Sequence, residues 1–120
     1  MANNTNWDEK RTKPRIAWSF VVKYRPYQDE SHQEWEVSCI QDISQGGCSF
    51  TSRFPFDIEG RLDIEIQFPA LEGPMRFVGV VKRCDKRATL YFIGVEFIEM
   101  DEVKKNTFLQ TLDFFLKKKR

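Results

Sequence analysis

The segment from Arg61 to Phe68 alternates between polar and apolar residues without a break, as a strand with one buried face does. Strand patterns also cover 16–25, 35–43, 75–84 and 89–97, and a shorter one at 48–51 follows a turn. Short strands separated by turns predict a mainly β fold with antiparallel pairing. We expect 75–84 and 89–97 to form a hairpin around Asp85, Lys86 and Arg87.

The hydrophobic period changes after Met100, where the strand pattern gives way to a helical one. Apolar residues then recur as one stripe at Phe108, Leu109, Leu112, Phe115 and Leu116. Asp101 is a favourable N-cap for this helix, which we expect to cover 101–117. Six strands over 16–98 and one helix predict a six-stranded antiparallel β-barrel with a C-terminal α-helix packed on it.

The composition narrows the possible functions. A chain of 120 residues suits one domain, and its 41% hydrophobic content can fill one core. A net charge of +1 argues against a general DNA- or RNA-binding protein. No apolar run reaches the roughly 20 residues of a membrane span, and the first residues do not resemble a signal peptide. We therefore expect a cytoplasmic protein without membrane insertion.

The sequence contains few residues that could form a metal centre or an active site. The three cysteines, Cys39, Cys48 and Cys84, form no CxxC, and His32 is the single histidine. Reduced thiols are the simplest interpretation of three cysteines in a cytoplasmic protein. Because no nucleophile stands with a base in the sequence, we expect neither an enzyme nor a bound metal or cofactor.

Two short motifs carry the chemistry that points to a ligand. The first, Arg11-Thr12-Lys13-Pro14-Arg15, holds two arginines four residues apart. An arginine fork can bind a phosphate through two hydrogen bonds and can also match the O6/N7 edge of guanine. The second, Asp42-Ile43-Ser44-Gln45-Gly46-Gly47, places a carboxylate and a hydroxyl in a turn. Taken singly, the first is typical of a solvated charged arm and the second of an ordinary turn.

Taken together, the two motifs resemble the RxxxR and DxSxxG motifs of the PilZ domain, the bacterial receptor module for cyclic di-GMP. The resemblance covers roughly residues 9 to 116 and implies a barrel with a helix. The polar residues 1–9 predict a flexible tail. The resemblance implies a domain at 10–120 and an arm at 10–15 that reaches across the barrel onto the ligand. The implied ligand-binding residues are Arg11, Arg15, Asp42, Ser44, Gly46 and Gly47, with Lys10 as the position just before the first motif arginine. The family's motif glycine falls at Gly47, and Gly46 is additional.

The chemistry of these residues fits cyclic di-GMP. Asp42 can accept from the N1–H and N2–H₂ donors of guanine, and Ser44 offers a hydroxyl to a base or phosphate. Gly46 and Gly47 are expected to let the chain bend and to let backbone amides approach the ligand. Lys82 and Arg83 are expected on opposite faces of a strand, and either they or Arg25 and Arg53 could also touch the ligand. Trp18 and Trp35 are expected in the core or on the barrel surface rather than under a base.

The resemblance implies a cyclic di-GMP effector that changes conformation on binding and signals to a separate protein. An adaptor for protein interactions, as in pilus assembly, with little or no nucleotide binding is the alternative. A monomer or weak homodimer is expected. The sequence leaves open the downstream pathway, the partner and whether one ligand or a stacked pair is bound.

Overall fold

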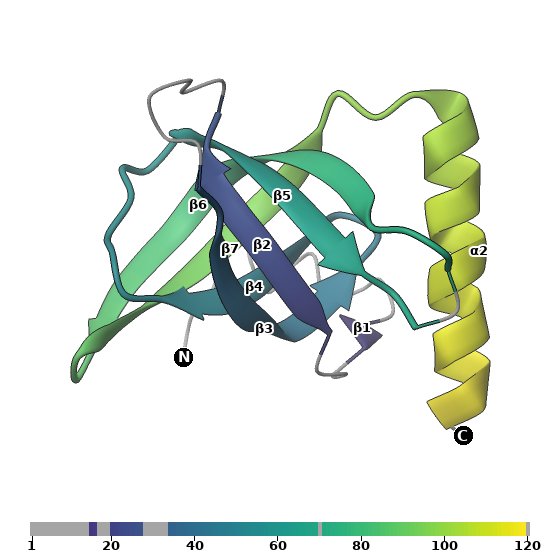
Figure 1. Cartoon of the computed structure of the whole chain (residues 1–120), viewed down its shortest axis with the longest axis horizontal. Coiled ribbons are helices and arrows are strands. Elements are labelled where there is room, and N and C mark those ends of the chain that lie inside the picture. The colour runs from purple at the N-terminus through teal and green to yellow at the C-terminus, as the bar shows by residue number, and fades with distance from the viewer. Residues whose placement is uncertain (1–14, 17–19, 28–33, 70, 120) are drawn as a thin grey trace.

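The structure, a computed structural model, describes residues 15–16, 20–27, 34–69 and 71–119. Its strands are β1 (Arg15–Ile16), β2 (Val21–Pro26), β3 (Glu36–Ser44), β4 (Gly47–Ser52), β5 (Arg61–Gln67), β6 (Met75–Arg87) and β7 (Leu90–Ile98). They are followed by one helix, α2 (Glu102–Lys119). Figure 1 shows the strands wrapped into a barrel and α2 standing across one end of it.

The strands are ordered β1-β3-β2-β5-β6-β7-β4, and every pairing in this sheet is antiparallel. The sheet closes because β3 pairs with β2 through its first half and with β4 through its second half. The two-residue strand β1 lies beside the end of β3 as an addition to the six strands of the barrel. The predicted six-stranded antiparallel barrel with a C-terminal helix is therefore confirmed.

Two strands differ from the prediction by more than one residue at a boundary. The 16–25 segment contributes Ile16 to β1 and residues from Val21 onward to β2, and Trp18 lies outside the described residues. The 75–97 hairpin turns at Ala88 and Thr89 rather than at Asp85, Lys86 and Arg87. The three charged residues continue the β6–β7 ladder because their solvent-facing positions tolerate charge within a strand. Ala88 takes the left-handed backbone conformation, with a φ of 57°, that a tight hairpin turn requires.

Helix α2 joins the core through the apolar stripe expected from the sequence. Phe108, Leu112 and Phe115 are buried, and the ring centroids of Phe115 and Phe20 lie 5.1 Å apart. Phe108 packs in the same way on Phe77, with centroids 4.9 Å apart. The backbone N–H of Lys104 donates to Asp101 Oδ1 at 2.7 Å, so Asp101 is the N-cap. The aromatic side chains of the helix thus pack against the core and close one end of the barrel.

All three cysteines are free thiols, at different depths. Cys48 is fully buried in β4, and this burial raises the pKa of its thiol, which keeps it protonated. Cys39 is exposed and Cys84 is half-buried. In the part of the chain that the structure describes, no helix is long and apolar enough to cross a membrane.

Candidate ligand-binding site

The described parts of the two motifs meet at the β1–β3 pairing. Asp42 and Ser44 lie at the end of β3, Gly46 lies in the β3–β4 turn, and Gly47 begins β4. Across the sheet, the Cα partner of Arg15 is Ser44. The backbone of the second motif arginine is therefore next to the motif serine. Lys10 and Arg11 lie outside the described residues, and of Arg15 only the backbone is described.

A bulge in β3 directs Asp42 to the outer face of the barrel. Ile40 and Ile43 are both buried although they are three residues apart, which unbroken alternation does not allow. The register explains this, because Ile40 pairs with Phe50 and Asp42 with Ser49, so Gln41 is an extra residue. With regular alternation from Ile40, the carboxylate would point into the apolar core.

Hydrogen bonds hold the outward side chains of this motif. The Ser49 hydroxyl, directly across from Asp42, donates to Asp42 Oδ1 at 3.2 Å. The backbone N–H of Gly46 donates to Ser44 Oγ at 3.3 Å. Since that hydroxyl accepts from Gly46, its proton can be given to another acceptor. The motif therefore presents a positioned carboxylate and a positioned hydroxyl on one face.

The two motif glycines are in different situations. A Cβ on Gly47 would lie 2.0 Å from the backbone oxygen of Val95 in β7, whereas a Cβ on Gly46 would meet nothing closer than Ser44 Oγ at 4.0 Å. Among the described glycines none takes a left-handed φ. The bend expected of them from the sequence therefore needs no left-handed backbone. Gly47 is required by the close approach of β4 to β7, and Gly46 is under no comparable steric demand.

A second bulge, in β6, brings two cations to the same side of the sheet. Val81 pairs with Val95 and Arg83 with Gly94, so Lys82 is the extra residue. The prediction that Lys82 and Arg83 lie on opposite faces is therefore wrong, and their side chains are 37% and 40% exposed. Lys82 Nζ lies 2.8 Å from Glu59 and 3.8 Å from Glu96, and the hydrogen bond to Glu59 raises the pKa of Lys82.

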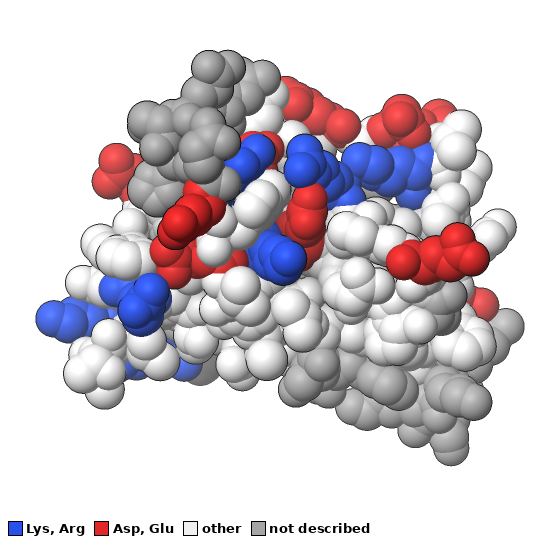
Figure 2. All heavy atoms as spheres, in the orientation of Figure 1, with Lys and Arg blue, Asp and Glu red and all other residues white. Residues whose placement is uncertain are grey.

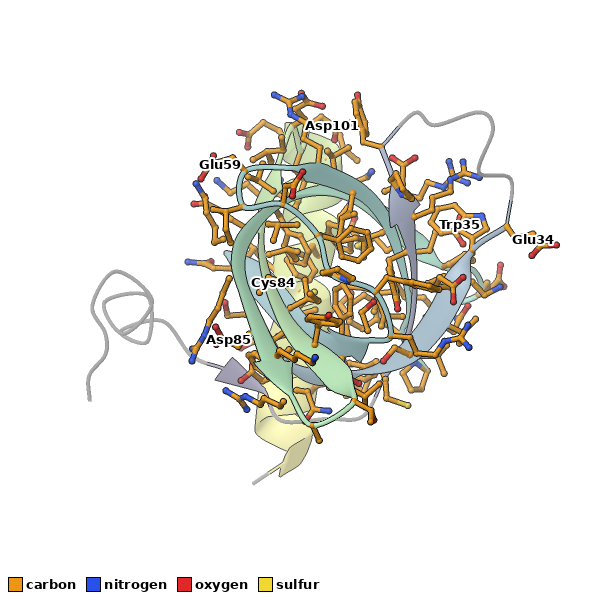
Figure 3. All side chains as sticks on the ribbon, turned by 90° about the vertical axis from the view of Figure 1, so that its left-hand side faces the viewer. Glu34, Trp35, Glu59, Cys84, Asp85 and Asp101 are labelled. Atoms are coloured by element: carbon orange, nitrogen blue, oxygen red, sulfur yellow. The ribbon has the colours of Figure 1, made fainter. Side chains whose placement is uncertain are left out.

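The other two arginines considered from the sequence form ion pairs elsewhere. Arg25 lies 3.5 Å from Asp63 and over the ring of Trp35, 4.2 Å from its centroid. Arg53 lies 3.1 Å from Glu36. Trp35 is half-buried on the barrel surface, as expected, and Figure 3 shows it on the opposite side of the barrel from Asp85. On the side that includes β2 and β5, basic and acidic side chains are interspersed in Figure 2.

A hollow beside the start of α2 is separate from both motifs. It measures about 210 Å³ and is lined by residues of β5, β6 and β7, by Glu99 and Met100 in the connection after β7, and by Lys104 of the helix. Lys104 Nζ donates to the backbone oxygen of Arg76 at 2.6 Å, which ties the helix to the barrel there. Among the described residues no group of three His, Cys, Asp or Glu side chains could hold a metal ion.

Comparison with known proteins identifies the family. The family model described as the PilZ domain matches residues 9–114, which is most of the chain and includes both motifs. The chain belongs to the PilZ domain family. No curated protein sequence matches it.

Several solved structures share the fold of this domain. The PilZ domain of YcgR from Escherichia coli, solved with c-di-GMP, is similar with a TM-score of 0.69 and 16% identity over 92% of this chain and 93% of that one. The Bacillus subtilis inhibitor of motility MotI/DgrA gives a TM-score of 0.72 and 20% identity over 92% of this chain and 53% of that one. The K. pneumonia MrkH–c-di-GMP complex gives 0.66 and 19% identity over 90% and 52%. This PilZ chain spans about half the length of MotI/DgrA and MrkH.

Proposed function

We propose that this PilZ domain is a receptor for cyclic di-GMP. The observation that carries the proposal is the register of β1 on β3, with Arg15 opposite Ser44 and two residues of β3 away from Asp42. Family membership and the likeness to YcgR and MrkH, both solved with c-di-GMP, support the same ligand.

The motif residues divide the recognition of this ligand between them. Arg11 and Arg15 bind phosphate oxygens or the guanine O6/N7 edge through charge-assisted hydrogen bonds. Asp42 accepts from the guanine N1–H and N2–H₂ groups, a donor pair that adenine lacks, and Ser44 donates to a base or phosphate. Gly47 keeps β4 close to β7 beneath them, and Gly46 leaves the turn without a side chain.

We further propose that binding acts as a switch in the cytoplasm. A ligand held by both Arg11 and Arg15 on one side and by Asp42 on the other stabilises the conformation in which the 10–15 arm lies on the barrel. The size of this shift in conformation is set by the difference between the ligand's affinities for the two conformations. A separate downstream protein then binds the altered surface, and the domain itself catalyses no reaction.

Calorimetric titration of the purified protein with cyclic di-GMP, alongside cyclic di-AMP, tests the receptor function. We expect guanine-specific binding, and we expect Arg11→Ala and Arg15→Ala each to cost about 1.5–3 kcal/mol, or roughly ten- to over a hundred-fold in affinity. Asp42→Ala should reduce the preference for the guanine dinucleotide. Arg53→Ala, which removes a cation paired with Glu36, is the matched control and should bind like the wild type.

Absence of binding by the folded wild-type protein would contradict the receptor proposal and favour the adaptor for protein interactions. Equal affinity in the wild type and in both arginine variants would contradict the assignment of Arg11 and Arg15 to the site. The ligand would then be bound by other residues.

A further inference from the structure

The row of outward-facing positions that starts at Asp42 continues across three strands and ends at Arg83. Asp42 pairs with Ser49 of β4, Ser49 with Gly94 of β7, and Gly94 with Arg83 of β6. Three strand spacings put the two ends of the row about 14 Å apart along the sheet. A carboxylate and a guanidinium at this separation suit a ligand larger than a single base.

Small residues lie between these two charged ends. Ser49 is fully buried although it lies on the outer face, and its hydroxyl is bonded to Asp42. Gly94 is also buried and has no side chain to stand between Ser49 and Arg83. The parallel row from Ser44 has Gly47 in the corresponding position of β4. The part of the sheet between Asp42 and Arg83, the floor, therefore carries no large side chain between its two charged ends.

Arg83 is held in position at the far edge of this floor. Its Nε donates to Asp85 Oδ2, and its guanidinium carbon lies 5.6 Å from the ring centroid of Phe92. The bond to Asp85 uses one of the five donors of the guanidinium, and the side chain is 40% exposed. The β6 bulge at Lys82 is what turns Arg83 to this face.

We infer that the ligand surface extends from β3 across β4 and β7 to β6, and that Arg83 donates to acceptor atoms of the bound nucleotide. This inference rests on the proposed function, since it concerns the same ligand. The acceptors are the O6/N7 edge of guanine or the phosphate oxygens, both of which an arginine fork matches.

Arg83→Ala in the full-length chain tests the inference, with Arg87→Ala as its matched control. Arg87 lies on the same strand, carries the same charge and contacts the same Phe92 ring, at 4.5 Å, but it pairs with Leu90 beyond the floor. We expect the affinity for cyclic di-GMP to fall at least tenfold in Arg83→Ala and less than threefold in Arg87→Ala. Thermal melts check that both variants are folded.

The Asp85→Asn variant distinguishes a contact between Arg83 and the ligand from a purely structural ion pair between Arg83 and Asp85. It breaks the pair from the other side and removes a negative charge near an anionic ligand, so we expect affinity equal to or tighter than that of the wild type. Equal weakening by Arg83→Ala and Asp85→Asn would overturn the inference in favour of a structural pair. Equal weakening by Arg83→Ala and Arg87→Ala would overturn it in favour of a general effect of positive charge.

Titration with cyclic di-AMP identifies which acceptors Arg83 contacts. Adenine presents an amino donor where guanine presents O6, so loss of a base contact lowers the preference for the guanine dinucleotide. Loss of a phosphate contact weakens both ligands equally. If Arg83→Ala binds like the wild type while Arg15→Ala does not, the inference fails and the receptor function stands. If the wild type itself does not bind, both fail.

Discussion

Two neighbouring glycines of one motif differ in what the structure demands of them. A methyl group on Gly47 would collide with the Val95 backbone oxygen, which cannot turn away as a side chain could. We expect Gly47→Ala to lower the free energy of unfolding by about 1–3 kcal/mol, the usual cost of overpacking. Gly46→Ala should change it by less than about 0.5 kcal/mol, as at an open surface position.

Urea unfolding of the two alanine variants and the wild type measures this difference. Equal loss of stability in both variants would mean that the turn, rather than the contact between β4 and β7, sets the need for glycine. The two variants also matter for binding studies. Weak ligand binding by a Gly47 variant would first indicate that the site is misfolded, and only then that Gly47 contacts the ligand.

At the scale of the elements, alternation predicted the strands well but could not place the bulges. The Arg61–Phe68 pattern became β5 with a boundary shift of one residue, and its apolar positions are buried. The β3 and β6 bulges lie in the stretches Ile40-Gln41-Asp42-Ile43 and Val81-Lys82-Arg83-Cys84. Each stretch has two polar residues between two apolar ones, and this break in the period of two is the signal in the sequence.

The candidate site depends on these bulges and on long-range register, which explains what sequence reasoning missed. The motif identified Asp42 and Ser44, and the structure brings the backbone of Arg15 beside Ser44. The position of Arg83 opposite Gly94 depends on the extra residue in β6 and on strands distant in sequence. Local patterns specify faces of strands, whereas register follows from pairing across the whole barrel.

The N-cap of α2 is an element-scale feature that can be tested alone. Asp101 Oδ1 accepts from the Lys104 N–H, and its side chain satisfies a donor that the helix leaves open. We expect Asp101→Ala to lower the free energy of unfolding by about 1 kcal/mol, and Asp101→Asn, which can still cap, to lower it far less. Thermal or urea unfolding compares the two. A similar loss in both would assign the effect to charge near the helix start instead of to the capping bond.

At the scale of the whole molecule, the candidate site and α2 are connected through β1. The strand that carries Arg15 pairs with β3 on one side and also contacts α2. The helix in turn packs on the core through Phe115 against Phe20, at the end of the barrel that it covers (Figure 1). A ligand that fixes β1 on β3 therefore acts on a strand that contacts α2, so the helix is a candidate route for the proposed signal.

Hydrogen exchange with and without cyclic di-GMP tests this route. We expect the ligand to slow amide exchange in peptides covering Asp42–Gly47 and in the α2 peptide around Phe115. Binding also stabilises the whole fold by mass action, which slows every amide that exchanges only through global unfolding. Short labelling times avoid this, because they report local opening, and β5, which pairs with neither β1 nor β3, serves as the internal control. Slowing in Asp42–Gly47 with none in α2 would exclude the helix as the route, whereas slowing in both but not in β5 would link the ligand to it through β1.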